Sequence, residues 1–247
     1  MDLYGLIGYP LKHSFSQRFF TEKFLTENID AQYSNFEIAD ISSFPEIVKS
    51  NTNLRGLNVT LPYKQQVIPF LDELDKQAKE IGAINVIKFI RENGTLRLVG
   101  YNSDIIGFQN SITPLIDKNI HTKALILGTG GASKAVIKGL QNLDIGYTYV
   151  SRTPKEKAFT YNDLNKDIIN EYKVIVNASP LGTFPDVNAS PDIPYEYISS
   201  DHLLYDLVYN PAETKFLRLG KEKGAKTKNG AEMLELQAVA AWKIWNK

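Results

Sequence analysis

One lysine directly follows a short strand pattern, at a position where its side chain can act on a bound molecule. In Asn58-Val59-Thr60-Leu61-Pro62-Tyr63-Lys64 the apolar and polar residues alternate as in a strand, and Pro62 is typical of a first helical turn. An ammonium at a helix start opposes the helix dipole, so helix stability does not account for Lys64. An ordinary lysine is protonated at neutral pH and can donate to an oxygen that gains charge. The alternative is an exposed surface lysine, the commonest environment for this residue type.

Asp104 is the acid that we expect to act with this lysine. It ends the segment Gly100-Tyr101-Asn102-Ser103-Asp104, after a predicted strand. A carboxylate beside an ammonium holds it in place and can hydrogen-bond the same substrate hydroxyl. We therefore predict that Lys64 and Asp104 are the catalytic pair of a ketone reduction. Asp104 is also a good helix N-cap, and the two roles are compatible.

Two serines in Gly8-Tyr9-Pro10-Leu11-Lys12-His13-Ser14-Phe15-Ser16 lie where the first loop enters a predicted helix. Hydroxyls beside the unpaired N–H groups of a helix start can bind a small carboxylate without a cationic side chain. Ser16 is also a good N-cap whatever the function. We expect His13 to be structural rather than catalytic.

The loop Gly128-Thr129-Gly130-Gly131-Ala132 stands between a predicted strand and a predicted helix, within a βαβ unit of about 30 residues. Backbone N–H groups of such a loop can approach a pyrophosphate, although a tight structural turn is the alternative. The general fingerprint has a third glycine where this chain has Ser133.

The residues at the end of the next predicted strand indicate which cofactor the chain binds. An NAD site has an acidic residue there, whereas this chain has Ser151-Arg152-Thr153 followed by Lys155 and Lys157. An arginine can pair with a 2′-phosphate, and no carboxylate is present to repel it. An exposed arginine in a polar turn is the alternative. We predict NADP(H) as the cofactor.

Together with Gly82-Ala83-Ile84-Asn85, these segments resemble the shikimate dehydrogenase family, in the same order and at about the same spacing over residues 3–237. The resemblance implies that Ser14 and Ser16 hold the substrate carboxylate, and that three side chains bond ring hydroxyls: Thr60, Asn85 and Gln237. It places Tyr209 in the substrate cleft. It assigns the cofactor to Gly128, Thr129, Gly130, Gly131, Ala132, Ser151, Arg152, Thr153, Leu207 and Gly230. It also places the loop of residues 177–182 near the cofactor.

The chain differs from the family pattern at a few of these places. Ser151 stands where asparagine is usual, and Gln17 and Phe20 replace the usual proline and histidine. The last two changes alter the rim of the carboxylate site and leave its hydroxyls in place.

Alternating strand and helix patterns position these residues and predict an α/β fold with mostly parallel sheets. Pro114 predicts a kink or early stop of the helix that follows residue 104, and Asn93-Gly94 predicts a hairpin. Ser43 with Glu46 and Pro45 resembles a capping box. The predicted strands are residues 3–8, 33–39, 84–90, 96–101, 124–127, 147–150, 173–176 and 203–207, and the predicted helices include 133–143 and 231–245.

We expect two domains. A substrate domain would comprise residues 1–104 and about 229–247, and a Rossmann-type, doubly wound NADP domain would comprise 105–228. The resemblance alone implies that the C-terminal helix returns to the first domain.

Composition excludes several classes of function. The 28 basic and 28 acidic residues give no broad field for nucleic acid or an anionic membrane, and no cysteine is present for disulfides, thiolate catalysis or cysteine metal sites. No apolar run approaches the length of a membrane span. We expect a cytoplasmic enzyme without a metal, a monomer or homodimer, whose partner is a small-molecule substrate.

The predicted reaction is the NADP-dependent interconversion of 3-dehydroshikimate and shikimate. A quinate or quinate/shikimate dehydrogenase is a close alternative, because spacing does not specify the polyol. A catalytically silent nucleotide-binding module would not need the Lys64–Asp104 pair. A dehydrogenase of the methylenetetrahydrofolate type is disfavoured by the serines at 14 and 16, which suit a small carboxylate.

Overall fold

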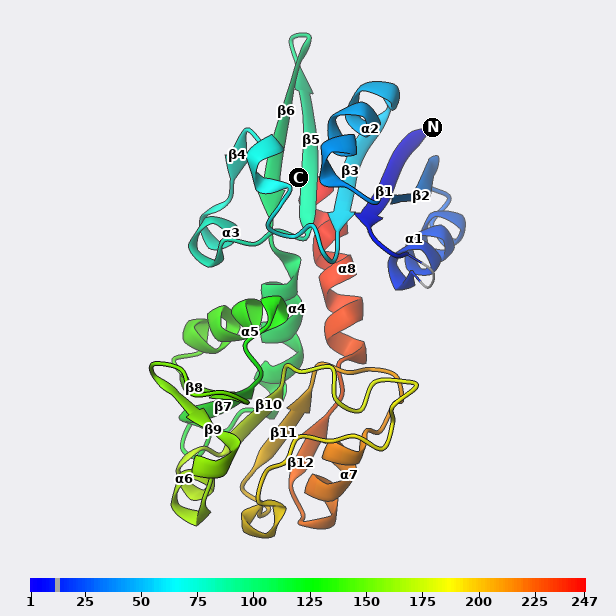
Figure 1. The fold of residues 1–247 in the computed structure, drawn as a ribbon. Helices are drawn as coiled ribbons and strands as arrows, with labels where there is room; N and C mark the ends of the chain where they lie inside the picture. Colours follow the sequence, from blue (N-terminus) through cyan, green and yellow to red (C-terminus); the bar gives the residue numbers. More distant parts are fainter. Residues whose placement is uncertain (12–13) are drawn as a thin grey trace. The chain divides into compact units, whose positions relative to one another are not determined.

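The computed structural model describes residues 1–11 and 14–247 and divides into two compact units (Figure 1). Unit 1 comprises Met1–Ser103 and Ala238–Lys247, and unit 2 comprises Asp104–Gln237. His13 lies outside the described residues. The domain boundaries expected from the sequence stay a proposal, because the two units are defined by packing alone.

Unit 1 contains a mixed sheet in the order β2-β1-β3-β5-β6-β4. β1 runs parallel to both β2 and β3, whereas β5 is antiparallel to β3 and β6. The strands are β1 (Asp2–Gly8), β2 (Ala31–Glu37), β3 (Leu54–Val59), β4 (Glu73–Leu74), β5 (Val86–Glu92) and β6 (Thr95–Tyr101). The predicted hairpin is confirmed, because β5 and β6 pair from Glu92 opposite Thr95, and Asn93 and Gly94 have φ of 51° and 76°.

The helices of unit 1 correct three sequence predictions. Ser14, rather than Ser16, caps the first helix and accepts from the N–H of Gln17. Ser43 makes no side-chain cap, because its backbone is already helical, so the capping box is wrong. No α-helix follows Pro62, where the chain makes turns. The helices are α1 (Phe15–Thr26), α2 (Phe44–Ser50), α3 (Lys76–Ile81) and the short 3-10 segments η1 (Ile41–Ser43) and η2 (Ile68–Phe70).

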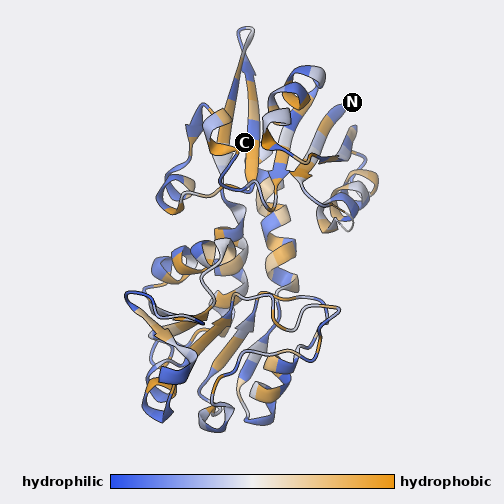
Figure 2. Ribbon diagram, viewed as in Figure 1, coloured by the Kyte–Doolittle hydropathy of each residue, from blue (hydrophilic) through white to orange (hydrophobic). Residues whose placement is uncertain are grey.

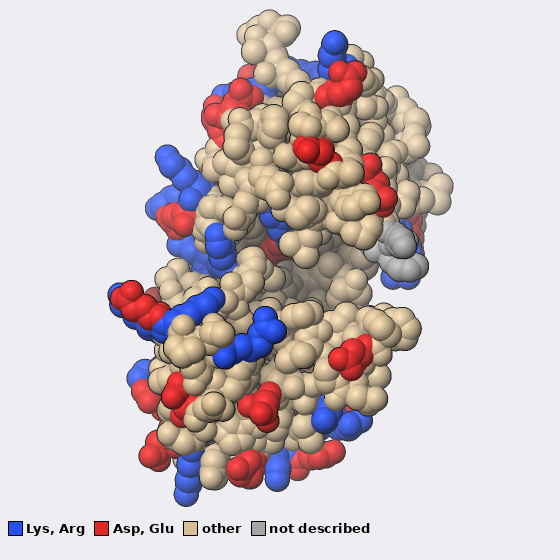
Figure 3. All heavy atoms as spheres, viewed as in Figure 1, with Lys and Arg blue, Asp and Glu red and all other residues tan. Residues whose placement is uncertain are grey.

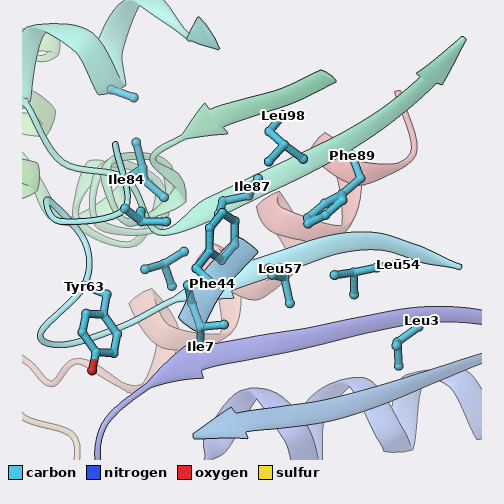
Figure 4. Close-up of a cluster of buried hydrophobic side chains, with 13 residues drawn as sticks. Leu3, Ile7, Phe44, Leu54, Leu57, Tyr63, Ile84, Ile87, Phe89 and Leu98 are labelled. Atoms are coloured by element: carbon cyan, nitrogen blue, oxygen red, sulfur yellow. The ribbon is translucent and has the colours of Figure 1, made fainter. Parts of the chain in front are cut away.

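Side chains from neighbouring strands form the core on one face of this sheet (Figure 4). Ile7 of β1, Leu57 of β3 and Ile87 of β5 are fully buried, and Phe44 at the start of α2 packs on them. The C-terminal segment joins a second cluster of unit 1, where the Trp245 indole donates to the carbonyl of Ile87 at 3.1 Å. The end of the chain therefore belongs to the core of unit 1.

Unit 2 contains a parallel sheet in the order β12-β11-β10-β7-β8-β9. The chain winds outward from β7 in one direction, then returns to the other side of β7, as in doubly wound nucleotide-binding sheets. The strands are β7 (Lys123–Leu127), β8 (Gly146–Ser151), β9 (Ala158–Thr160), β10 (Val174–Asn177), β11 (Leu203–Asp206) and β12 (Lys226–Lys228). The neighbouring strands β10 and β11 are buried at every residue, which explains why each is apolar up to its last residue, Asn177 or Asp206 (Figure 2).

Helices connect these strands, and two of the sequence predictions for them are confirmed. The helix before Pro114 ends at Ile112 and continues as a 3-10 turn, and the final helix has the predicted bounds. α8 begins in unit 2 and ends in unit 1. The helices are α4 (Ser103–Ile112), η3 (Thr113–Leu115), α5 (Gly131–Asn142), η4 (Tyr161–Asp163), α6 (Lys166–Glu171), η5 (Tyr195–Tyr197), α7 (Lys215–Glu222) and α8 (Ala231–Trp245).

A buried histidine precedes β11. The Nδ1 of His202 accepts from the N–H of Ser199 at 3.0 Å, and its Nε2 contacts the carbonyl of Ile169 at 2.9 Å. A carbonyl can only accept, so the ring is neutral with its proton on Nε2. Burial lowers the pKa of His202 below its usual value. Protonation would place a second N–H against the N–H of Ser199.

We predict that His202 makes unit 2 less stable in acid. Because its pKa is lower when folded, its contribution to stability is complete above about pH 6.5 and is lost as the pH falls below that value. Between about pH 7.5 and 5.5, the wild type should lose roughly 1 kcal/mol more than His202→Gln, whose amide can still donate to Ile169. Urea unfolding at both pH values measures this, and equal losses would contradict it. Asp206 changes the stability in the opposite direction as the pH falls, because burial raises its pKa to about 6. This contribution is the same in both proteins and cancels when the wild type is compared with the variant.

Candidate active site

Lys64 lies in a series of turns after β3. The N–H of Tyr63 donates to Thr60 and that of Val67 donates to Tyr63, whereas the carbonyl of Lys64 accepts from the N–H of Ile84 at 2.8 Å. The N–H of Ile68, which would donate to Lys64 in an α-helix, donates instead to the carbonyl of Gln65, so the predicted helix does not form. The bond from Ile84 fixes the half-buried Lys64 to the segment that leads into Asn85.

A chain of buried polar groups lies beside this turn in unit 1. The hydroxyl of Tyr33 on β2 donates to the Oδ1 of Asn58 at 2.7 Å, and the amide of Asn58 donates to the carbonyl of Asn85 at 3.3 Å. Burial raises the pKa of the Tyr33 hydroxyl, and the side chain of Ser16 opposes this rise. The ring of Phe20 stacks on Tyr33 with 4.9 Å between centroids. Tyr33 therefore connects the first helix to the ends of β3 and β5.

Asn85 is buried and turned toward the start of α4. Its Oδ1 accepts from the N–H of Ser103 at 2.7 Å, and its amide donates to the Ser103 hydroxyl at 3.0 Å. Its backbone N–H donates to Tyr101. These bonds orient Asn85 within unit 1, and its predicted contact with a substrate hydroxyl stays a prediction.

The hydroxyl of Ser14 accepts from the N–H of Gln17 at 3.1 Å as the cap of α1. A hydroxyl that accepts can still donate its own proton. The side chain of Gln17 accepts from Asn35 on β2 at 2.9 Å, so this departure from the family pattern joins α1 to the sheet. Unit 1 thus holds Ser14 and Ser16 on the first turn of one helix.

Two residues expected at the substrate belong to unit 2. Asp104 lies in the first turn of α4, one residue inside the helix, so it is not the N-cap. The buried Gln237 on α8 donates to the carbonyl of Leu234 at 3.0 Å. The pairing of Asp104 with Lys64 of unit 1 stays a prediction.

The glycine loop joins β7 to α5 in unit 2. Gly128 has φ of +109°, and a Cβ there would lie 3.3 Å from the backbone of residues 178 and 179. Side chains at Gly130 or Gly131 would instead enter open space. Ser133, in place of the third glycine, is buried and donates to the carbonyl of Gly130 at 2.6 Å. The loop therefore leaves room at the N-terminus of α5 for a pyrophosphate.

A cavity of about 880 Å³ in unit 2 connects this loop with the end of β8. It is lined by Gly128, Thr129, Gly130, Val150, Ser151, Arg152, Thr153, Lys155, Tyr161, Ala178, Ser179, Pro180, Leu181, Ser190 and Asp192. The hydroxyl of Ser151 accepts from the N–H of Thr153 at 3.4 Å, and the ammonium of Lys155 donates to Thr129 at 2.8 Å. The predicted glycine loop and the predicted 2′-phosphate residues thus share one cavity.

Other predicted cofactor residues lie elsewhere in unit 2. Among the residues that the structure describes, Gly131, Ala132, Leu207 and Gly230 do not line this cavity. Leu207 and Gly230 do lie together, because a Cβ on Gly230 would overlap the carbonyl of Leu207. The exposed Tyr209 follows Leu207 by two residues.

Sequence reasoning missed two buried polar residues, Tyr33 and Asp206. Tyr33 stands in an alternating strand pattern and Asp206 ends an apolar one, and in these patterns neither residue gives a separate signal. Asn177 was noticed only as the start of a loop that resembles the family.

No group of three or more potential metal ligands occurs in residues 1–11 and 14–247. Over the same residues, no helix has the length and apolar character needed to cross a bilayer. Basic and acidic side chains are interspersed on the visible face of each unit (Figure 3).

Comparisons with known proteins give one consistent family. The pattern of the shikimate dehydrogenase substrate binding domain matches residues 6–87. A shikimate dehydrogenase (NADP(+)) of Carboxydothermus hydrogenoformans is 40% identical over 98% of this chain and 91% of its own length.

Solved structures agree with this result. The shikimate dehydrogenase of Aquifex aeolicus is 38% identical and superposes with a TM-score of 0.86, covering 100% of this chain and 92% of that one. The enzyme of Thermus thermophilus, solved in complex with NADP(H) and shikimate, is 30% identical with a TM-score of 0.83, covering 99% of this chain and 93% of that one. The motifs, the two-unit α/β fold and the full-length similarity together place this chain in the shikimate dehydrogenase family.

Proposed function

We propose that this chain catalyses the reversible, NADP-dependent reduction of 3-dehydroshikimate to shikimate. The observation that carries the proposal is the cavity of unit 2, where the glycine loop faces Arg152 and the strand end bears no acid. Two relatives that cover 98% and 97% of the chain are shikimate dehydrogenases (NADP(+)).

The residues of unit 2 fit this cofactor. Backbone N–H groups of residues 129–132 would hold the pyrophosphate at the start of α5. Arg152, with Ser151 and Thr153, would hold the 2′-phosphate, since a guanidinium can form two parallel bonds to it. Leu207 and Gly230 would support the remaining part of the cofactor. When bound, NADPH supplies the hydride that reduces the ring ketone.

Hydroxyl and amide groups would bind the substrate. Ser14 retains a proton to donate to the substrate carboxylate, and the hydroxyl of Ser16 would donate a second hydrogen bond to it. We propose that the ring hydroxyls are bound by Thr60, Asn85 and Gln237, with Tyr209 at the cleft.

Proton transfer is assigned to Lys64. As hydride reaches the carbon, the ketone oxygen gains negative charge, and the Lys64 ammonium donates a proton to it. In the oxidative direction Lys64 accepts the hydroxyl proton. Asp104 would orient the ammonium and hydrogen-bond the same oxygen.

We infer that the partners are small molecules, that the enzyme acts as a monomer or homodimer, and that it is cytoplasmic. Quinate differs from shikimate in the ring that Thr60, Asn85 and Gln237 would contact. The kcat/KM measured with each of the two substrates therefore tests this assignment.

Lys64→Ala should lower turnover of shikimate by about 10²- to 10⁴-fold, because the proton donor is lost. NADPH binding, measured by fluorescence titration, should stay within about twofold, since Lys64 belongs to unit 1. Lys49→Ala, at an exposed position of α2, is the matched control and should retain activity. Near-normal turnover of Lys64→Ala would remove this residue from the chemistry.

Arg152→Ala should raise the KM for NADPH by about 10- to 100-fold, the scale of a lost charge-assisted hydrogen bond. The KM for NADH should change by less than about threefold, because NADH lacks the 2′-phosphate. Arg218→Ala, an exposed position of α7 outside the cavity, serves as the control. If the KM rises equally for NADPH and NADH, Arg152 does not bind the 2′-phosphate.

A further inference from the structure

Asp206 is a fully buried carboxylate with no assigned part in the chemistry. It ends β11, and its Oδ1 accepts from the amide of Asn177 at 2.9 Å and from the N–H of Val208 at 3.0 Å. Its Oδ2 accepts from the hydroxyl of Thr214 at 2.6 Å. Burial raises the pKa of Asp206 to about 6, and the three hydrogen bonds oppose this rise. Burying a carboxylate costs free energy, which these bonds offset only in part.

The carboxylate determines which way the side chain of Asn177 faces. An amide has a donor end and an acceptor end of almost the same shape, whereas an ionised carboxylate only accepts. Asp206 therefore selects the orientation with the Nδ2 of Asn177 toward it. The Oδ1 of Asn177 then faces Ser179 and accepts from its N–H at 3.1 Å and its hydroxyl at 2.6 Å. The Nδ2 also donates to the carbonyl of Leu181 at 3.3 Å.

These bonds close the loop of residues 177–182, which forms one wall of the cavity. Residues 178–181 line it together with Arg152 and the glycine loop. A Cβ added at Gly128 would lie 3.3 Å from the backbone of residues 178 and 179. A change in this loop would therefore alter the space between the wall and the glycine loop.

Asp206 also holds the segments that follow β11. Val208 adjoins Leu207, which we assign to the cofactor. Thr214 caps α7 by accepting from the N–H of Leu217 at 3.4 Å. One carboxylate thus joins the end of β10, the end of β11 and the start of α7.

We propose that Asp206 is a positioning residue for the cofactor site, acting through the orientation of Asn177 on the loop of residues 177–182. The proposal rests on the proposed NADP-binding function of unit 2. Asp206 does not line the cavity, so we expect its effect on cofactor affinity and not on proton transfer.

Asn177→Asp tests this directly, because it places a second carboxylate against Asp206 without changing the shape of the side chain. At about pH 5.5 the two acids can share a proton that replaces the bond between Asn177 and Asp206, whereas at higher pH the loss of that proton leaves two carboxylates that repel each other. The Kd for NADPH, divided by that of the wild type at the same pH, should be near one at the lower pH and rise about 10-fold or more at the higher pH. The KM for shikimate should change by less than about twofold.

Asp206→Asn is the second variant, and it keeps the shape while replacing one of the two accepting oxygens with an amide that donates, so residue 206 can no longer accept from all three of its partners. Its Kd for NADPH should rise about 3- to 10-fold at neutral pH without a fall in melting temperature, since a buried charge is also removed. Asp167→Asn, on the exposed face of α6, is the matched control and should change neither quantity. Asp206→Asn carries the test by itself if Asn177→Asp does not fold.

Unchanged relative Kd values for both variants, or a fall in melting temperature alone, would overturn the proposal and leave Asp206 a purely structural residue. A wild type that binds no NADPH and turns over no shikimate would instead contradict the proposed function itself.

Discussion

The parallel pairing of β7 with β8 on one side and with β10 on the other organises unit 2. Leu127, the last residue of β7, is in register with both Val150 and Asn177. Since parallel strands end at the same edge of a sheet, the glycine loop, the Arg152 segment and the loop of residues 177–182 leave that edge together. The cavity between them follows from this register. A slip of one residue would move every side chain of the slipped strand to the opposite face of the sheet and shift the loops relative to one another.

Unit 1 is also organised by contacts at the ends of its strands, although its sheet is mixed rather than parallel. The first helix, β2, β3 and β5 are joined by buried polar groups at the ends of strands, through Tyr33 and Asn58. A single backbone bond from Ile84 to Lys64 fixes the turn that presents the lysine. Buried polar groups without partners are costly, so these connections specify one arrangement rather than several. Each unit thereby provides a rigid support for one half of the proposed chemistry.

Local signals in the sequence were sufficient to predict some structural elements. Asn93-Gly94 specified the hairpin, and Pro114 specified the end of α4, because the cause and effect lie within a few residues. The helix expected after Pro62 was wrong, since the chain makes turns there and the carbonyl of Lys64 accepts from Ile84, twenty positions along the chain, a contact that no local pattern predicts. The types and order of the residues were enough to predict that the glycine loop and Arg152 belong to one site, and both line the same cavity. The Asp206–Asn177 bond was not, since only the register of β10 and β11 brings the two together.

The rate of reduction of 3-dehydroshikimate by the wild-type protein, with NADPH and separately with NADH, tests the central claim most directly. Loss of the absorbance of the reduced nicotinamide gives the initial rate in each case. We predict a kcat/KM at least about 10-fold higher for NADPH, the scale of one charge-assisted bond to the 2′-phosphate. Equal rates with the two cofactors would contradict the role assigned to Arg152. No reduction with either cofactor would contradict the proposed reaction.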